Sequence, residues 1–140
     1  MQVPVQRNWS LYSLLIIYKV FPELSVIGYP PKDLLLKPQF IDDNTRALQT
    51  IASRATGIDL IVGYAARNEQ PVGRPLHNAV AVLRDGKIAS VHYKTLLPTY
   101  DVFDESRYFQ PAKRQRVFRL GQEQLGVTIC EDIWNDKRKH

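Results

Sequence analysis

Two strand-like runs joined by Asp85-Gly86 constrain the fold of this 140-residue chain more than any other feature. The runs form the segment NAVAVLRDGKIASVHYK, from Asn78 to Lys94. Aspartate followed by glycine is a favoured two-residue turn between antiparallel strands, because both residues tolerate a positive φ. The segment therefore predicts a β-hairpin, with Lys94 leaving the end of its second strand.

The residues before this hairpin predict a strand–helix–strand unit. Ser13–Val20 and Ile58–Ala65 are apolar runs rich in Ile, Leu and Val, which is typical of strands buried on both faces. A helix is predicted between them, capped by Asp42 or Asp43 and ending near Thr56. The apolar residues of its inward face follow helical spacing: Ala47, Leu48, Ile51, Ala52 and Ala55.

A second hairpin is predicted after a long irregular stretch that covers Thr95–Arg116. Its strands are Val117–Leu120 and the buried-looking run Leu125–Cys130, with a turn at Gly121. Strands dominate the whole chain and one clear helix packs on them, so we expect an α/β layered fold. The length suits a single domain over residues 1–140; the structure of residues 1–12 is left open.

Charge, apolar content and the number of histidines and cysteines argue against several classes of function. The net charge of +5 comes largely from Ala112–Arg119 and Asp136–His140, which read as solvated loops without a nucleic-acid-binding pattern. No apolar run is long enough to cross a bilayer, so no membrane partner is expected. The three histidines share no ligand-like spacing with the cysteine, so we expect no metal site. The solitary Cys130 fits a reducing cytoplasm.

Three charged or nucleophilic side chains follow apolar strands: Glu23 in VFPEL, Lys94 in VHYKTLLP and Cys130 in LGVTIC. A cysteine attacks as thiolate and therefore needs a base or a local positive charge nearby. A desolvated Glu23 can take the proton, and the Lys94 ammonium can stabilise the developing oxyanion. Taken singly, the same residues also fit a solvated carboxylate, an exposed amine and an inert buried thiol. The set indicates amide C–N hydrolysis through a thioester.

The sequence motifs around these residues resemble those of a known protein family. FPEL with GYPPKDLLL, then YKTLLPTYDVFDESRYF and GVTICEDIW, resemble the nitrilase (carbon–nitrogen hydrolase) superfamily. More narrowly, they are similar to the branch formed by the amino-terminal glutaminase domains of glutamine-dependent NAD synthetases. The resemblance extends from about Val20 to Asp136. It implies part of an α-β-β-α sandwich with mixed, mostly antiparallel strands.

The resemblance also assigns roles by motif. Glu23 resembles the general base of the family, Lys94 its oxyanion-stabilising lysine and Cys130 its nucleophile. Glu105 matches the further glutamate that positions the lysine and the substrate. The residues that resemble the glutamine-holding side chains of the branch are Tyr100, Glu131 and Trp134.

The implied function is glutamine amidohydrolysis, which supplies ammonia for NAD synthesis from deamido-NAD. The glutaminase step needs no cofactor, whereas ATP and Mg²⁺ would serve a synthetase domain that this chain does not contain. Residues 1–19 depart from the strand and long helix that normally open the family, and the chain ends ten residues after Cys130. We therefore expect an incomplete nitrilase-like domain.

Whether this chain is an enzyme stays open at this point. One hypothesis is a glutaminase; the alternative is an inactive, truncated remnant that keeps the motifs without the support their geometry needs. A third, a basic nucleic-acid-binding module, has only the net charge in its favour. An incomplete sandwich also leaves sheet faces and strand edges uncovered, which favours aggregation or a homo-oligomer.

Overall fold

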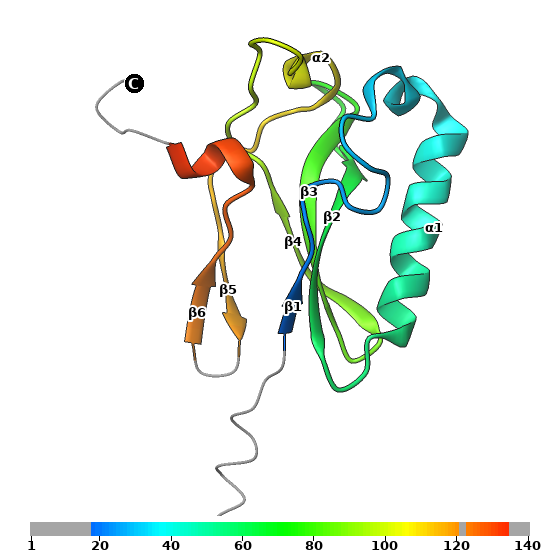
Figure 1. Cartoon of the computed structure of the whole chain (residues 1–140), viewed down its shortest axis with the longest axis vertical. Helices are drawn as coiled ribbons and strands as arrows, with labels where there is room; N and C mark the ends of the chain where they lie inside the picture. Colours follow the sequence, from blue (N-terminus) through cyan, green and yellow to red (C-terminus); the bar gives the residue numbers. More distant parts are fainter. Residues whose placement is uncertain (1–17, 121–122, 135–140) are drawn as a thin grey trace, which may run out of the picture.

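The computed structural model of the chain describes residues 18–120 and 123–134, and it has three layers (Figure 1). A long helix, a four-stranded sheet and a two-stranded hairpin lie side by side, from right to left in that view. The helix is α1 (Pro38–Arg54), and the sheet contains β1 (Tyr18–Val20), β2 (Asp59–Arg67), β3 (Leu76–Arg84) and β4 (Lys87–Tyr93). The hairpin contains β5 (Val117–Leu120) and β6 (Glu123–Gly126), and the short helices are η2 (Lys32–Leu36), α2 (Glu105–Tyr108) and η3 (Cys130–Trp134).

The four-stranded sheet is mixed, in the order β1-β2-β3-β4. β1 and β2 run parallel and are connected through α1, whereas β2, β3 and β4 pair antiparallel. The predicted β-α-β unit and the predicted hairpin are therefore both confirmed. Asp85 and Gly86 have φ values of 49° and 78°, as the two-residue turn requires. The α/β class and the mixed pairing follow from these two units.

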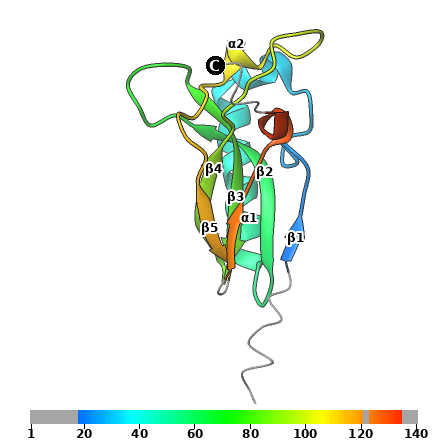
Figure 2. The ribbon, with the colours of Figure 1, turned by 90° about the vertical axis from the view of Figure 1, so that its left-hand side faces the viewer.

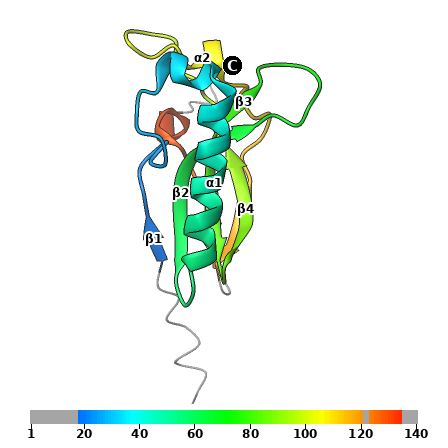
Figure 3. The same cartoon turned by 90° about the vertical axis from the view of Figure 1, so that its right-hand side faces the viewer.

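The central strands β2 and β3 are buried on both faces of the sheet, to which their side chains point alternately. Helix α1 covers one face (Figure 3), and the β5-β6 hairpin lies over the opposite face (Figure 2). The core under α1 is formed by Leu48, Ala52, Ala55, Val62, Tyr64, Ala66, Ala79, Ala81 and Leu83. The core under the hairpin is formed by Ile61, Val80, Val82, Phe118 and Ile129.

Helix α1 begins earlier than its predicted cap. Pro38 occupies its first turn, where a missing N–H breaks no helical hydrogen bond, and Lys37 is the N-cap. Asp42 and Asp43 lie inside the helix on its exposed side, so the prediction that one of them caps it was wrong. Its end near Thr56 is confirmed, with Gly57 at φ 71° just beyond. Within the described ranges, no helix is long and apolar enough to cross a membrane.

Two predicted strands also differ from the structure. Of Ser13–Val20, only β1 lies among the described residues, and its three side chains are exposed rather than buried. In the part of the chain that the structure describes, it is an edge strand with no strand paired on its outer side. The predicted strand Leu125–Cys130 ends at Gly126, and Cys130 starts η3 instead. Ile129 is buried, but the four residues of β6 are exposed or half-buried. Residues 1–12 lie outside the described ranges.

Beyond the end of β1, other groups satisfy the backbone of β2. The carbonyl of Ile61 accepts from the N–H of Phe21 at 2.8 Å, and the carbonyl of Gly63 accepts from Val26 N at 3.1 Å. The side-chain amide of the buried Asn44, on α1, donates to the Ala65 carbonyl at 2.7 Å. Because buried backbone groups need partners, these bonds fix the segment after β1 against β2. That segment carries Glu23.

Leu48→Ala tests the core under α1. Leu48 is 1% exposed, so its truncation should lower the free energy of unfolding by about 2–5 kcal/mol through lost burial and a residual cavity. Chemical denaturation would measure this. Gln49→Ala, at the exposed neighbouring position, should change the same quantity by no more than about 0.5 kcal/mol. Equal effects of the two substitutions would contradict the described packing of α1.

Candidate active site

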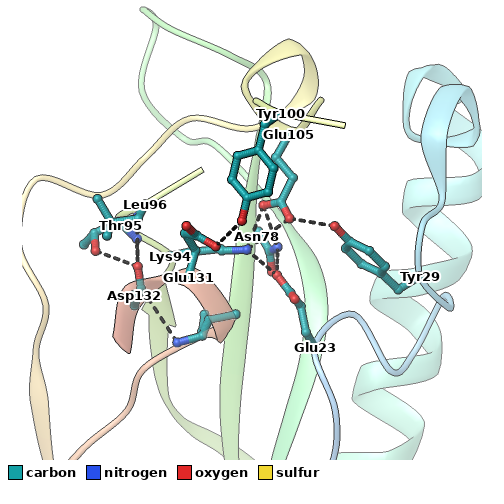
Figure 4. A network of polar contacts seen from close by, with 11 residues as sticks. Glu23, Tyr29, Asn78, Lys94, Thr95, Leu96, Tyr100, Glu105, Glu131 and Asp132 are labelled. Carbon is teal, nitrogen blue, oxygen red and sulfur yellow. Dashed lines mark hydrogen bonds and ion pairs between the residues drawn. The ribbon is translucent and has the colours of Figure 1, made fainter. Parts of the chain in front are cut away.

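The structure gathers a lysine and two glutamates from three separate elements at one end of the sheet (Figure 4). Lys94 follows β4, Glu23 lies in the segment after β1, and Glu105 is the first residue of α2. Lys94 Nζ lies 2.6 Å from Glu23 Oε1 and 3.0 Å from each carboxylate oxygen of Glu105. Three predicted site residues are therefore in direct contact.

Lys94 is fully buried, with an exposed fraction of 0%. Burial by itself lowers the pKa of Lys94, but the hydrogen bond to Glu23 and the charges of Glu105 and Glu23 outweigh it, so the pKa is raised. Among the described residues, the ammonium contacts one oxygen of Glu23 and both oxygens of Glu105. The structure thus holds a permanent positive charge where no solvent reaches it.

Glu105 is 5% exposed and accepts hydrogen bonds from several donors. Burial raises the pKa of the Glu105 carboxyl, and the nearby charge of Lys94 only partly reverses this. Tyr29 also donates to Glu105 Oε1 at 3.0 Å, and the pKa of this tyrosine is raised by burial and by the charge of Glu105. Tyr29 lies in the GYPP motif, and sequence reasoning gave it no role.

Asn78 is a second residue that the sequence interpretation missed. It lies in β3, is 1% exposed, and donates from Nδ2 to Glu23 Oε1 at 2.6 Å and to Glu105 Oε2 at 3.2 Å. An asparagine directly before the apolar run Ala79–Leu83 of β3 is the signal that could have found it, because a buried amide needs polar partners. The partners themselves come from other elements, so the sequence did not show them.

Gly63 lets the Glu23 segment lie directly on β2. A Cβ at this position would lie 2.5 Å from both Pro22 O and Leu24 N, which are backbone atoms. Only a glycine permits this approach, and an isolated glycine inside a strand is the sequence signal for it. Gly63 also accepts the hydroxyl hydrogen bond of Ser25 at 3.2 Å. The close contact places Glu23 beside Lys94.

Cys130 lies at the start of η3 with its backbone at φ 46° and its side chain exposed. Desolvation of the sulfur and the charge of Glu23 raise the pKa of the thiol, while the charge of Lys94 lowers it; the net shift is upward. The resting sulfur is therefore protonated at neutral pH. A thiol in this state needs a base to release its proton as it attacks.

Asp132 ties the cysteine segment to the lysine segment, and sequence reasoning assigned it no role. Its Oδ1 accepts from the backbone N–H groups of Thr95 and Leu96 at 2.9 Å and 2.8 Å, and from the Thr95 hydroxyl at 2.7 Å. Its Oδ2 accepts from Ile129 N at 3.1 Å. One buried carboxylate thereby fixes the residue before Cys130 relative to the residues after Lys94.

The predicted glutamine-holding residues lie on the exposed side of the cluster. The Tyr100 hydroxyl donates to Glu131 Oε2 at 2.9 Å, and the Tyr100 ring meets the Phe103 ring edge-on at 5.7 Å. These contacts bring Tyr100 and Glu131 together next to Cys130. Trp134, at the end of η3, is 76% exposed and has no hydrogen bond to the cluster among the described residues.

A pocket of about 250 Å³ opens beside the cluster, between the turn that contains Tyr29 and the segment that leads into α2. Its lining includes Tyr29, Phe103 and Glu105, but neither Lys94 nor Cys130. A substrate in this pocket would touch Glu105 and not the thiol. The surface formed by Cys130, Tyr100 and Glu131 is therefore the better place for a reacting substrate.

The chain matches the carbon–nitrogen hydrolase family over residues 16–140. A glutamine-dependent NAD(+) synthetase from Thermotoga maritima is 45% identical over 118 residues, which are 83% of this chain and 20% of that protein. The corresponding protein from Synechocystis is 42% identical over 120 residues, which are 83% of this chain and 22% of that protein. The chain spans about a fifth of the length of these relatives.

Two solved structures have folds similar to that of this chain. A glutamine-dependent NAD+ synthetase from Acinetobacter baumannii superposes with a TM-score of 0.76 at 41% identity, over 84% of this chain and 22% of that one. An amidase of the nitrilase superfamily from Nesterenkonia superposes with a TM-score of 0.66 at 22% identity, over 84% of this chain and 44% of that one. The second likeness concerns the fold alone, and both support the nitrilase-type arrangement of layers.

Gly63→Ala should move the Glu23 segment. The new methyl group would overlap two backbone atoms that cannot rotate away, so the free energy of unfolding should fall by about 1–3 kcal/mol. Gly126→Ala is the matched control, because a Cβ there meets nothing within 4 Å. Denaturant melts of both variants make the comparison. If Gly63→Ala were as stable as Gly126→Ala, the close approach would be wrong.

The reactivity of Cys130 should follow the charges around it. Because the pKa of its thiol is raised, alkylation by iodoacetamide should reach half of its maximal rate at a higher pH than for an ordinary cysteine. Lys94→Met should move this midpoint further up, and Glu23→Gln should move it down. Mass spectrometry reads the reaction at the single cysteine. A midpoint unmoved by either substitution would place the sulfur away from the cluster.

Proposed function

Because the chain belongs to the carbon–nitrogen hydrolase family, we propose that its site hydrolyses the side-chain amide of glutamine through a thioester on Cys130. The observation that carries the proposal is the fully buried Lys94, held between Glu23 and Glu105 beside the cysteine segment. A base, a fixed positive charge and a thiol are the three groups that amide hydrolysis by a cysteine requires.

In the first half of the reaction, Glu23 takes the proton of the Cys130 thiol as the sulfur attacks the amide carbon. Among the described residues, both hydrogen bonds that Glu23 accepts end on Oε1, so Oε2 is left for this proton. The carbonyl π electrons move to the oxygen, and the Lys94 ammonium stabilises the resulting oxyanion. When the C–N bond breaks, Glu23 returns the proton to the nitrogen and ammonia leaves.

In the second half, water hydrolyses the thioester. Glu23, again ionised, takes a proton from the water, and the hydroxide oxygen attacks the thioester carbon. The carbon–sulfur bond then breaks, the sulfur recovers a proton from Glu23, and glutamate leaves. Glu105 keeps Lys94 in place through both halves, because it contributes two of the three contacts to the ammonium. The sum is glutamine and water to glutamate and ammonia.

Glutamine is the proposed substrate because the relatives above are named as glutamine-dependent enzymes. An α-ammonium group is positively charged, and the carboxylate of Glu131 next to Cys130 offers it a partner. Tyr100 orients that carboxylate through its hydroxyl hydrogen bond. The resemblance adds Trp134 to this set, and its exposed ring leaves it available to a bound amino acid.

The ammonia would serve NAD synthesis from deamido-NAD, the reaction that the names of the relatives indicate. The hydrolysis needs no cofactor in this scheme, and ATP with Mg²⁺ would be used by a synthetase domain of the kind indicated by the names of the relatives. A cytoplasmic location and a homo-oligomer formed through exposed sheet surface remain predictions. The exposed side chains of β1, Tyr18 and Val20, are one place where a second chain could pack.

Ammonia release from glutamine tests the proposal directly. The purified chain should release ammonia from glutamine but not from glutamate, and Cys130→Ala should abolish the release. A glutamine-like diazo ketone should add one adduct at Cys130, seen by mass spectrometry, and free glutamine should protect against it.

Lys94→Met removes the positive charge that stabilises the oxyanion. We expect kcat to fall by at least about 100-fold relative to the unsubstituted chain. An unmodified Cys130 after treatment with the diazo ketone, together with no ammonia above the Cys130→Ala background, would contradict the proposal. That pair of results would favour an inactive remnant that keeps the motifs without catalysis.

A further inference from the structure

Asn78 is the only neutral side chain that donates to both carboxylates of the site among the described residues. Its position is fixed by the sheet, because its backbone carbonyl accepts from Lys94 N at 2.8 Å. Asn78 and Lys94 are thus neighbours across two strands, and their side chains meet the same two glutamates. Asn78 is nearly as deeply buried as Lys94, with exposed fractions of 1% and 0%.

The orientation of the Asn78 amide follows from charge. Turning the amide over would place its carbonyl oxygen against Glu23 and Glu105, both of which present carboxylate oxygens, so the N–H₂ group must face them. This orientation leaves Asn78 Oδ1 buried without a hydrogen-bond partner in the described structure. An unpaired buried carbonyl is unfavourable. The cost of the unpaired carbonyl is offset by the two hydrogen bonds that the N–H₂ group donates to the carboxylates.

The charges of the cluster explain what those donors do. Glu23 and Glu105 together carry two negative charges when ionised, and the single positive charge of Lys94 offsets one of them. Two carboxylates this close favour sharing a proton, unless donors stabilise the ionised forms. Two neutral groups donate here: the hydroxyl of Tyr29, to Glu105 alone, and the amide of Asn78, to both.

We propose that Asn78 is a positioning residue that keeps the carboxylate pair ionised and holds Glu23 ready to accept the proton of Cys130. The inference rests on the proposed role of Glu23 as the base of amide hydrolysis. The titratable groups that face the pair are Lys94, which follows β4, Tyr29 from the turn before η2, and Cys130 from η3, with Glu131 acting on Cys130. Of the residues that the structure describes, Asn78, from β3, is the one that links the two carboxylates and cannot itself titrate.

Asn78→Ala and Asn44→Ala form a matched pair for the test. Each removes a buried asparagine amide, but Asn44 bonds only to the backbone of Ala65, away from the carboxylates. Both variants should lose stability. Only Asn78→Ala should make the pair bind a proton at higher pH, by about one pH unit, because hydrogen bonds to the ionised form are lost.

Two readouts separate this inference from the proposed function. The first is a ¹³C titration of the glutamate Cδ atoms in the whole chain, assigned with Glu23→Gln and Glu105→Gln; it needs no turnover. The second is the acid limb of kcat/KM for glutamine, which should move up by the same amount in Asn78→Ala and stay in place in Asn44→Ala. If the wild-type chain does not hydrolyse glutamine, the titration alone decides.

A titration of Asn78→Ala that coincides with the wild type would overturn the inference. An equal shift in Asn44→Ala would do so as well, because it would reveal general loosening. If Asn78→Ala does not fold, Asn78→Ser provides the same measurement, since its short hydroxyl cannot reach both carboxylates. A shift confined to the Asn78 variants supports the assignment.

Discussion

The burial of Lys94 is the constraint on which the rest of this structure depends. A lone ammonium without solvent contact would lose its proton or disrupt the fold, so its partners must be brought to it. The chain supplies them from two distant places, Glu23 after the first strand and Glu105 in α2, within the long segment between β4 and β5. The site is therefore complete only when the folded sheet brings these segments together. The same charge that requires these partners is the charge that a developing oxyanion would use.

The central strands act as the platform for this assembly. Gly63 on β2 lets the backbone on both sides of Glu23 pack without a side chain between them. Asn78 on β3 reaches both carboxylates, and Lys94 follows directly from β4. Asp132 then fixes the cysteine segment to the residues after Lys94. Each catalytic group thus stands on a strand end or on a segment that is hydrogen-bonded to one, which is the kind of support that precise geometry needs.

Much of the fold follows from the sequence where local chemistry decides. The Asp85-Gly86 turn and the apolar face of α1 are local patterns, and both are confirmed. Pro38 is a local signal for the start of α1, because proline is favoured in the first turn of a helix. The prediction missed it because Asp42 and Asp43 are residues that also favour an N-cap position. The prediction that β1 is buried was wrong. An apolar strand is buried only if other elements cover it, and the local sequence pattern does not specify those elements.

The residues of the site likewise fall into those that local sequence motifs predicted and those that only the structure revealed. Glu23, Lys94, Glu105 and Cys130 each follow an apolar strand or a recognisable motif, and the structure joins the first three by direct contacts. Asn78, Gly63 and Asp132 were not predicted as site residues, because their importance lies in contacts between segments far apart in the chain. Asn78 and Asp132 are buried polar residues with partners far away in sequence. Asn78 lies 55 positions from Glu23 and 27 from Glu105. Asp132 lies 37 positions from Thr95 and 36 from Leu96. Only the folded arrangement reveals such partners.

The ionisation of Lys94 tests the central claim most directly. A heteronuclear NMR titration of its side-chain ammonium, assigned by comparison with Lys94→Met, would follow the charge in the folded chain. The two carboxylates outweigh the effect of burial, so the pKa of Lys94 should lie above the ordinary lysine value, and the ammonium should persist at higher pH than a surface lysine. A pKa below the ordinary value would show that burial prevails over the carboxylates, and it would contradict the cluster described here.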